Sequence, residues 1–174
     1  TEWGALAGIF PVDERTLSWL RERAKFLKKS GSEHARINEA RIAELEAYPL
    51  TADADADYAI ELNLDLGTVE PYISGPNTVK VMASASEMRE RRVQVHKAYL
   101  LSCVNSRVDD LAEAAAILRD KKVAPDVKFY VAAASSEVQA ESEKRGDWQV
   151  LMKAGAIALA AGCGACIGLG QGTL

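Results

Sequence analysis

The chain has 174 residues, of which 48% are hydrophobic and 26% charged, and its 21 basic and 25 acidic residues leave a net charge of -4. A folded chain of this size removes roughly 70% of its unfolded surface from water, which is enough for one main domain and an appendage. The acidic balance argues against nucleic acid and anionic membranes as partners. The start has no basic region leading into an apolar run, and the apolar stretch near the end is rich in glycine, so we expect neither a signal peptide nor a transmembrane helix.

The first part of the chain predicts one clear helix and one weak helix. Asp13 is a typical N-cap for a helix that runs to about Lys29, whose apolar face includes Leu17 and Ala24. In the segment that follows, the apolar positions are mostly alanine and only weakly periodic. A weak helix is the most that this pattern indicates.

The aspartates of TADADADY imitate the first ligands of a calcium loop. Tyr58 and Leu64, however, stand where such a loop needs glycine and glutamate, so we interpret this stretch as a solvated linker. Ile60, Leu62 and Leu64 then alternate with polar residues, which predicts a strand.

Strands and helices alternate from there to the end of the chain. Apolar runs predict strands at 95–102, 127–134 and 156–160. Between them we expect a helix that begins near Asp109, a helix over 135–146, and a short helix capped by Asp147. This order predicts an α/β fold, a three-layer αβα arrangement with a mainly parallel sheet covered on both faces. We divide the chain into a helical segment 1–30, a linker or weak helix 31–57, and an αβα domain 58–174.

The three cysteines are the candidate chemical groups. Cys103 follows the first of these strands, and Cys163 and Cys166 follow the third. An odd number of cysteines argues against a closed disulfide framework. The carboxyl ends of parallel strands meet at one edge of a sheet, so the fold could gather all three thiols there. Three thiolates suit an iron-sulfur cluster or a zinc ion, and the neighbouring glycines let backbone amides approach sulfur.

Other uses of the cysteines stay open on these grounds alone. A single C-x-x-C is a weak signal, and a thioredoxin-like pair would open a helix early in its domain. A zinc site could recruit His34 or His96, although neither has a second histidine at metal-binding spacing. Packing of cysteine as a small apolar residue is the default from composition.

Two motifs carry a resemblance that covers essentially the whole chain. SCVNS at 102–106 and CGACIG at 163–168 resemble the S-C-T-N-S and C-G-P-C-I-G motifs of the aconitase superfamily, in the same order and at a similar separation. The chain departs from the family pattern at Val104, usually threonine, and at Ala165, usually proline. Neither departure removes a thiolate.

The resemblance implies a set of site residues. Cys103, Cys163 and Cys166 would hold a 4Fe-4S cluster in which one iron has no protein ligand, and Ser102 and Asn105 would orient the ligands by hydrogen bonds. EWGALAGIFP resembles the family's E-x-G-A segment, in which a glutamate contacts the substrate hydroxyl, and this role carries over to Glu2.

The implied activity is that of a hydro-lyase. FYVAAAS and YISGPNTVKV are most similar to the fungal, lysine-biosynthesis branch of the superfamily, whose members act on a tricarboxylate and hydrate cis-homoaconitate to homoisocitrate. The resemblance implies that the chain is an internal section, that segment 1–30 ends a preceding aconitase domain, and that this piece alone is inactive. It also implies the mitochondrial matrix as location.

Three alternatives remain beside this activity. An isopropylmalate isomerase or an aconitase of the same superfamily would share the cysteines. A non-catalytic interaction or RNA-binding scaffold would follow from the family's occasional roles without a cluster. The residues give it little support, because the chain is acidic and its one basic stretch, EMRERRVQVHK, contains glutamates and has no aromatic neighbours for base stacking.

Overall fold

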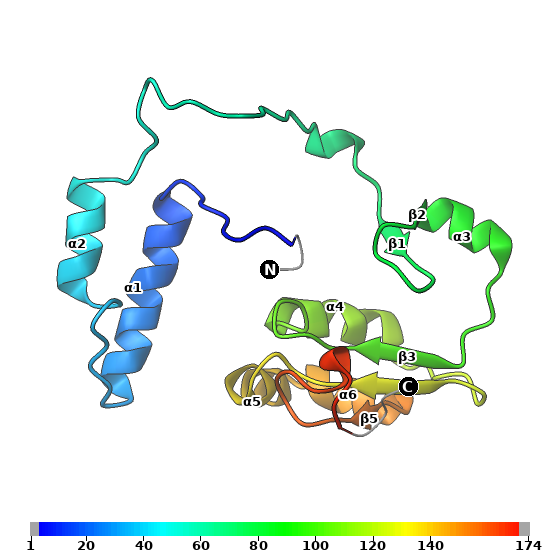
Figure 1. The fold of residues 1–174 in the computed structure, drawn as a ribbon. Coiled ribbons are helices and arrows are strands. Elements are labelled where there is room, and N and C mark those ends of the chain that lie inside the picture. The colour runs from blue at the N-terminus through cyan, green and yellow to red at the C-terminus, as the bar shows by residue number, and fades with distance from the viewer. Residues whose placement is uncertain (1–3, 171–174) are drawn as a thin grey trace. The chain divides into compact units, whose positions relative to one another are not determined.

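The computed structural model describes residues 4–170 and divides the chain into two compact units, Thr1–Leu66 and Gly67–Leu174 (Figure 1). None of the described helices is both long enough and apolar enough to cross a membrane.

The first unit contains two helices that pack against each other, α1 (Glu14–Lys29) and α2 (Glu39–Ala47). The Asp13 side chain caps α1 by accepting hydrogen bonds from the backbone N–H and the hydroxyl of Thr16, both at 2.8 Å. The predicted start and end of this helix are therefore confirmed. The weak helix is also present, because Asn38 caps α2 and accepts from the backbone N–H of Arg41 at 2.9 Å.

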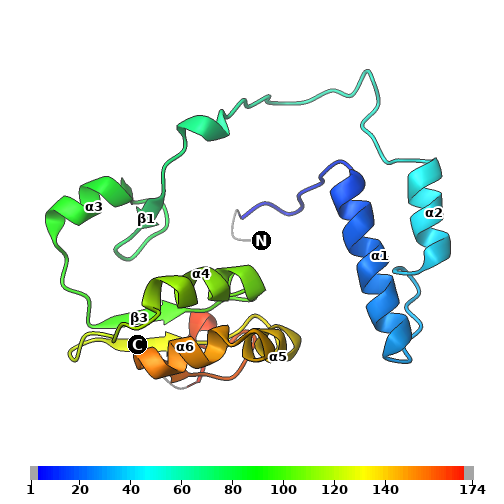
Figure 2. The ribbon, with the colours of Figure 1, turned by 180° about the vertical axis from the view of Figure 1, so that it is seen from behind.

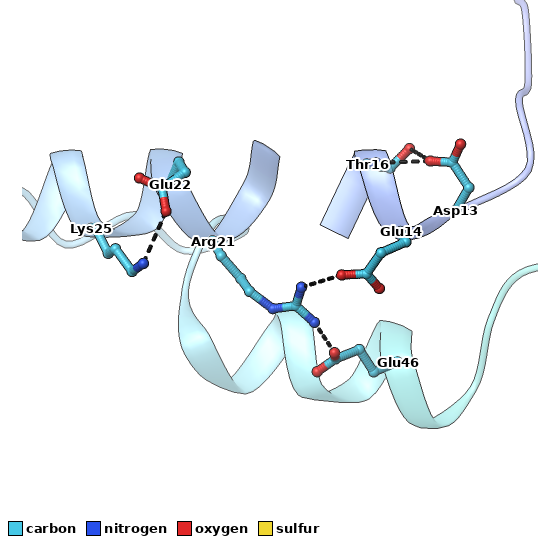
Figure 3. Close-up of polar contacts among 7 residues, drawn as sticks. All are labelled: Asp13, Glu14, Thr16, Arg21, Glu22, Lys25 and Glu46. Atoms are coloured by element: carbon cyan, nitrogen blue, oxygen red, sulfur yellow. Dashed lines mark hydrogen bonds and ion pairs between the residues drawn. The ribbon is translucent and has the colours of Figure 1, made fainter. Parts of the chain in front are cut away.

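A small apolar contact and a charged bridge join the two helices. Leu17 and Ala24 of α1 and Ile42 of α2 form the buried cluster. Arg21 of α1 bonds Glu14 of the same helix at 2.8 Å and also pairs with Glu46 of α2 (Figure 3). The hydrogen bond to Glu14, together with the charge of Glu46, raises the pKa of Arg21. Arg21 thus ties the first turn of α1 to the last turn of α2.

The prediction of a strand around Ile60 is wrong. Residues 49–65 form no strand, and the short 3₁₀ turn η1 (Leu66–Thr68) follows them. Ile60, Leu62 and Leu64 are 75%, 83% and 71% exposed. Alternation alone does not make a strand here, because within the described residues no neighbouring strand takes up the N–H and C=O groups of this segment.

A hairpin and a short helix begin the second unit. β1 (Tyr72–Ser74) pairs antiparallel with β2 (Met82–Ser84), and α3 (Ala85–Arg91) follows directly. A capping box starts α3, because the Ser84 hydroxyl accepts from the Glu87 N–H while the Glu87 carboxylate accepts from the Ser84 N–H. The basic stretch noted in the sequence lies in and just after this helix.

The main sheet is parallel and has the strand order β3-β4-β5. Its strands are β3 (Lys97–Leu100), β4 (Lys128–Val131) and β5 (Ile157–Ala158), so all three predicted strands are confirmed. Tyr99, Tyr130 and Ile157 stand in one row across the sheet. The rings of the two tyrosines stack with their centroids 5.1 Å apart.

Three helices cover the sheet face that carries Leu100 and Val131 (Figure 2). They are α4 (Val108–Leu118), α5 (Ser136–Arg145) and α6 (Asp147–Ala154), and they also contact one another. The connection from β3 to β4 contains α4, and the connection from β4 to β5 contains α5 and α6. Both connections move in the same direction across the sheet, so right-handed crossovers place all three helices on one face. Their shared core contains Leu111, Ala115, Val131, Ala133, Ala134, Val138, Trp148 and Leu151.

The α/β class with a parallel sheet is therefore confirmed. The prediction had helices on both faces of the sheet, and within residues 4–170 the helices α4, α5 and α6 form one layer on one face. One detail differs from the prediction: Gly146 takes the N-cap position of α6, and Asp147 lies in the first turn. Arg145 pairs with Asp147 at 3.1 Å, which favours this arrangement.

Candidate metal centre

The loop after β3 presents Cys103 on a turn closed by its neighbour. The Ser102 hydroxyl accepts hydrogen bonds from the backbone N–H groups of Val104 and Asn105, at 3.1 and 3.3 Å. Ser102 also has a positive φ of 124°, a backbone conformation that is costly for a residue with a side chain. The Ser102 hydroxyl therefore holds the backbone that directly follows Cys103.

Ser106 is a residue that the sequence reasoning did not single out. It lies in the same loop, is fully buried, and its hydroxyl has no hydrogen-bond partner among the described residues. Its φ of 51° is also left-handed. The sequence signal that could have identified Ser106 is its place as the last residue of the SCVNS motif. A buried serine in such a motif is expected to shape the loop.

The loop after β5 presents the other two cysteines between glycines. Gly162 and Gly168 have φ values of 104° and 77°, which glycine adopts without strain. Cys163 precedes the 3₁₀ turn η2 (Ala165–Ile167), and Cys166 is the middle residue of that turn. The N–H of Leu169 donates to the carbonyl of Gly164 at 3.0 Å and closes the loop.

The two loops bring the thiols together at the carboxyl end of the sheet. The Cys163 thiol donates a hydrogen bond to Cys103 Sγ, and the two sulfur atoms are 3.5 Å apart although the residues are 60 positions apart in sequence. This hydrogen bond is the main cause that raises the pKa of Cys163, and Cys166 adds to the increase. All three side chains are exposed. The three predicted ligands thus lie in one neighbourhood.

The donor set fits an iron-sulfur cluster in its chemistry. Soft thiolates favour iron-sulfur clusters and zinc, and glycines without side chains allow backbone amides to approach and donate to sulfur. The arrangement is not a finished ligand cage, since residues 4–170 contain no group of three or more His, Cys, Asp or Glu side chains already set to hold a metal. A metal must displace the thiol protons, including the one that Cys163 donates toward Cys103, so loading should release protons and improve as pH rises.

The remaining predicted site residues lie elsewhere. His34 accepts hydrogen bonds from the backbone N–H groups of Arg36 and Ile37 and so shapes its own turn. His96 directly precedes β3 and is therefore at the opposite end of that strand from Cys103. The side chain of Asn105 is exposed, and only its backbone N–H takes part in the turn at Ser102. Glu2 lies outside the described residues.

A cavity of about 220 Å³ lies beside the cysteine loop at this end of the sheet. It is formed by Leu101, Ala132, Ala158, Leu159, Ala160, Gly162, Gly164, Ala165, Leu169 and Gly170. These residues are small or apolar and carry no charge.

The fold and the site define an α/β protein with a thiol-rich candidate metal centre at the carboxyl edge of a parallel sheet. The whole chain, residues 1–174, matches the model of the Aconitase family (aconitate hydratase). The chain belongs to the aconitase family.

Several curated fungal proteins align with the entire chain. It is 53% identical to "Homoaconitase, mitochondrial" of Mycosarcoma maydis, 51% identical to the protein of the same name from Candida albicans, and 48% identical to that of Cryptococcus neoformans. In each case 100% of this chain is aligned, but only 25% or 26% of the relative. The chain therefore spans about a quarter of the length of these relatives.

Proposed function

We propose that the protein of which this chain forms part is a hydro-lyase that hydrates cis-homoaconitate to homoisocitrate. The observation that carries the proposal is the meeting of Cys103 and Cys163 at 3.5 Å, with Cys166 close enough to act on the pKa of Cys163. Membership of the aconitase family and the names of the relatives support the reaction class and the substrate.

Each cysteine has a distinct place in the proposed centre. Cys103 from the first loop and Cys163 and Cys166 from the second would hold a 4Fe-4S cluster. When bound, such a cluster supplies a Lewis acid that polarises a substrate oxygen. Ser102 would hold the Cys103 loop in place during loading, because its hydroxyl already binds the backbone of Val104 and Asn105.

The proposed reaction also needs residues other than the three cysteines. We propose that Glu2 contacts the substrate hydroxyl and handles its proton, by analogy with the glutamate of the family's E-x-G-A segment. Hydration also needs groups that bind the three carboxylates. The uncharged lining of the cavity beside the cysteine loop is why we expect no turnover from these 174 residues alone.

The proposal extends to the setting of the enzyme. We assign segment 1–30 to the end of a preceding domain, 31–57 to a linker, and 58–174 to the cluster-bearing domain. The relatives carry the word mitochondrial in their names, which supports a mitochondrial location. The matrix and a role in lysine biosynthesis are assigned from the resemblance of the sequence motifs alone.

A substrate panel on the full-length protein tests the reaction. Hydration of cis-homoaconitate, cis-aconitate and the dehydrated isopropylmalate should be followed by loss of their unsaturated absorbance. We expect cis-homoaconitate to have the highest kcat/KM, and Cys103→Ser to abolish turnover while Ile117→Ala, an exposed change on α4, keeps it. Preference for either other substrate, or activity retained in Cys103→Ser, would overturn the proposal.

A further inference from the structure

The backbone of β4 continues past the end of the strand and keeps hydrogen bonds to both neighbouring segments. Ala132 N–H donates to the carbonyl of Leu100 at 3.0 Å, and Leu159 N–H donates to the carbonyl of Val131 at 2.8 Å. These two bonds follow the regular parallel ladder, in which every second residue faces the same neighbour. The next two bonds depart from it, one on each side.

On the β3 side, the departure makes room for Cys103. A regular ladder would pair Ala134 with residue 102, but Ala134 N–H donates instead to the carbonyl of Ser106 at 3.0 Å. Residues 102–105 are looped out between the two bonded positions. Cys103 lies in this loop, and the bond to Ser106 fixes where the loop returns to the sheet.

On the β5 side, a smaller departure places Cys163. The regular partner of the Ala133 carbonyl would be the N–H of residue 161, but the bond comes from Gly162 at 2.9 Å. One extra residue is therefore accommodated, as in a β-bulge, which shifts the direction of the side chains that follow. Cys163 is the first residue after this bond.

We infer that Ala133 and Ala134 are positioning residues that hold the two thiol-bearing loops in register with each other. Both loops are bonded to consecutive residues of one backbone segment, so movement of either loop against the other must break a bond to it. This inference deepens the proposed function, because it names what sets the spacing of the proposed ligands. It concerns the thiols themselves and is tested without iron.

The surroundings of the two alanines suit this role. Ala133 is fully buried and Ala134 is 7% exposed, and both belong to the core shared with α4, α5 and α6. A backbone segment inside a close-packed core is rigid, since its neighbours leave no room for displacement. Larger side chains would push against the same core, which accounts for alanine at both positions.

Thiol–disulfide equilibrium measures the register directly. In a Cys166→Ser background, glutathione disulfide oxidises Cys103 and Cys163: the two thiols lose their protons, one Sγ–Sγ bond forms, and the oxidant is reduced to two glutathione thiols. The equilibrium gives the effective concentration of one thiol at the other. Ala134→Pro removes the N–H that holds Ser106, and we expect it to lower this effective concentration by about fivefold or more, as the loss of one hydrogen bond implies.

Ala160→Pro is the matched control. Ala160 lies in the Cys163 loop, is exposed, and its N–H donates no hydrogen bond among the described residues, so this proline should leave the effective concentration within about twofold of the parent. Equal loss in the two variants would overturn the inference, since it would show a general effect of proline. Far-UV circular dichroism establishes that both variants are folded.

If Ala134→Pro does not fold, amide hydrogen exchange on the unmutated chain tests the inference independently. The N–H groups of Ala134 and Gly162 should exchange as slowly as those of β4. Exchange at the rate of unstructured loop amides would contradict the inference. Because neither measurement involves iron or substrate, failure here is separate from failure of the proposed hydro-lyase function.

Discussion

The α1–α2 pair and the α/β region around β4 are stabilised by different kinds of contact. The helix pair buries only Leu17, Ala24 and Ile42, and it depends on side-chain caps and on the bridge made by Arg21. The α/β region buries eight core residues drawn from one strand, its extension and three helices. The first region thus combines exposed polar contacts with a small apolar cluster, and the second has the larger apolar core.

This contrast explains why the candidate site is where it is. A thiol centre made from two loops needs a support that does not move, and the segment after β4 is buried on the core of the α/β region. The helix pair offers no such support, because its contacts are mostly exposed and exchange with water. Four predictions test the contrast.

The largest effect is expected from Leu111→Ala. Leu111 is fully buried in the core under β4, so the substitution should destabilise the α/β region by about 2–5 kcal/mol. Urea unfolding followed by the fluorescence of Trp148, with Trp3 and Trp19 replaced by phenylalanine, reports on this region. Ile117→Ala on the same helix is the control and should change stability by less than about 0.5 kcal/mol. Equal effects would mean that the assigned core is not the stabilising one.

Two serines in the Cys103 loop, Ser102 and Ser106, allow a hydroxyl that accepts hydrogen bonds to be compared with one that has no partner in the described structure. Ser102→Ala removes the acceptor for two backbone N–H groups and should cost about 1 kcal/mol in the free energy of unfolding. Ser106→Ala removes a buried hydroxyl without a partner in the described structure, so it should leave stability unchanged or raise it. Chemical denaturation of both variants decides, and the reverse order would show that the loop is built differently.

The bridge between the two helices should give a smaller, salt-dependent effect. Arg21→Gln removes the charge that pairs with Glu14 and Glu46, and it should lower the helical signal of the first unit at low salt. At 1 M salt the difference between variant and parent should vanish, because the Debye length falls to roughly 3 Å. A difference that persists at high salt would point to lost packing by the arginine stem rather than lost charge.

The smallest effect concerns the cap of α1. The bonds from Thr16 lower the pKa of Asp13 below its ordinary value of 3.8. A lowered pKa means that the charged cap stabilises the helix at pH values above 3.8 and that this contribution is lost as the pH falls through the folded-state pKa. The helical signal should show this acid transition in the parent and lack it in Asp13→Ala. Identical acid titrations in the two proteins would contradict the assignment.

The sequence predicted most of the elements because their signals are local. Asp13, Ser135 and Gly146 marked helix ends correctly, and apolar runs marked β3, β4 and β5. The failure at Ile60 has a physical cause, since alternation reports only that two faces differ, and strand formation needs a partner. Whether a partner exists is a property of the whole fold.

The candidate site was predictable in kind but not in geometry. Cys103, Cys163 and Cys166 could be recognised from their motifs and from the rule that parallel strands end at one edge. The backbone bonds of Ala133 and Ala134 could not, because three consecutive alanines after a strand carry no local signal of which neighbour they bind. Those bonds depend on the number of residues looped out on each side.

The most direct test of the account is anaerobic reconstitution of this chain with iron and sulfide. Iron and sulfide should be counted and EPR spectra recorded for the parent, for Cys103→Ser and for the control Ile117→Ala. We predict about four irons in the parent and the control, and loss of the cluster in Cys103→Ser, because the three thiols together make the centre. A cluster retained without the Cys103 thiol, or no cluster in any of the three proteins, would contradict the claim that these two loops form an iron-sulfur site.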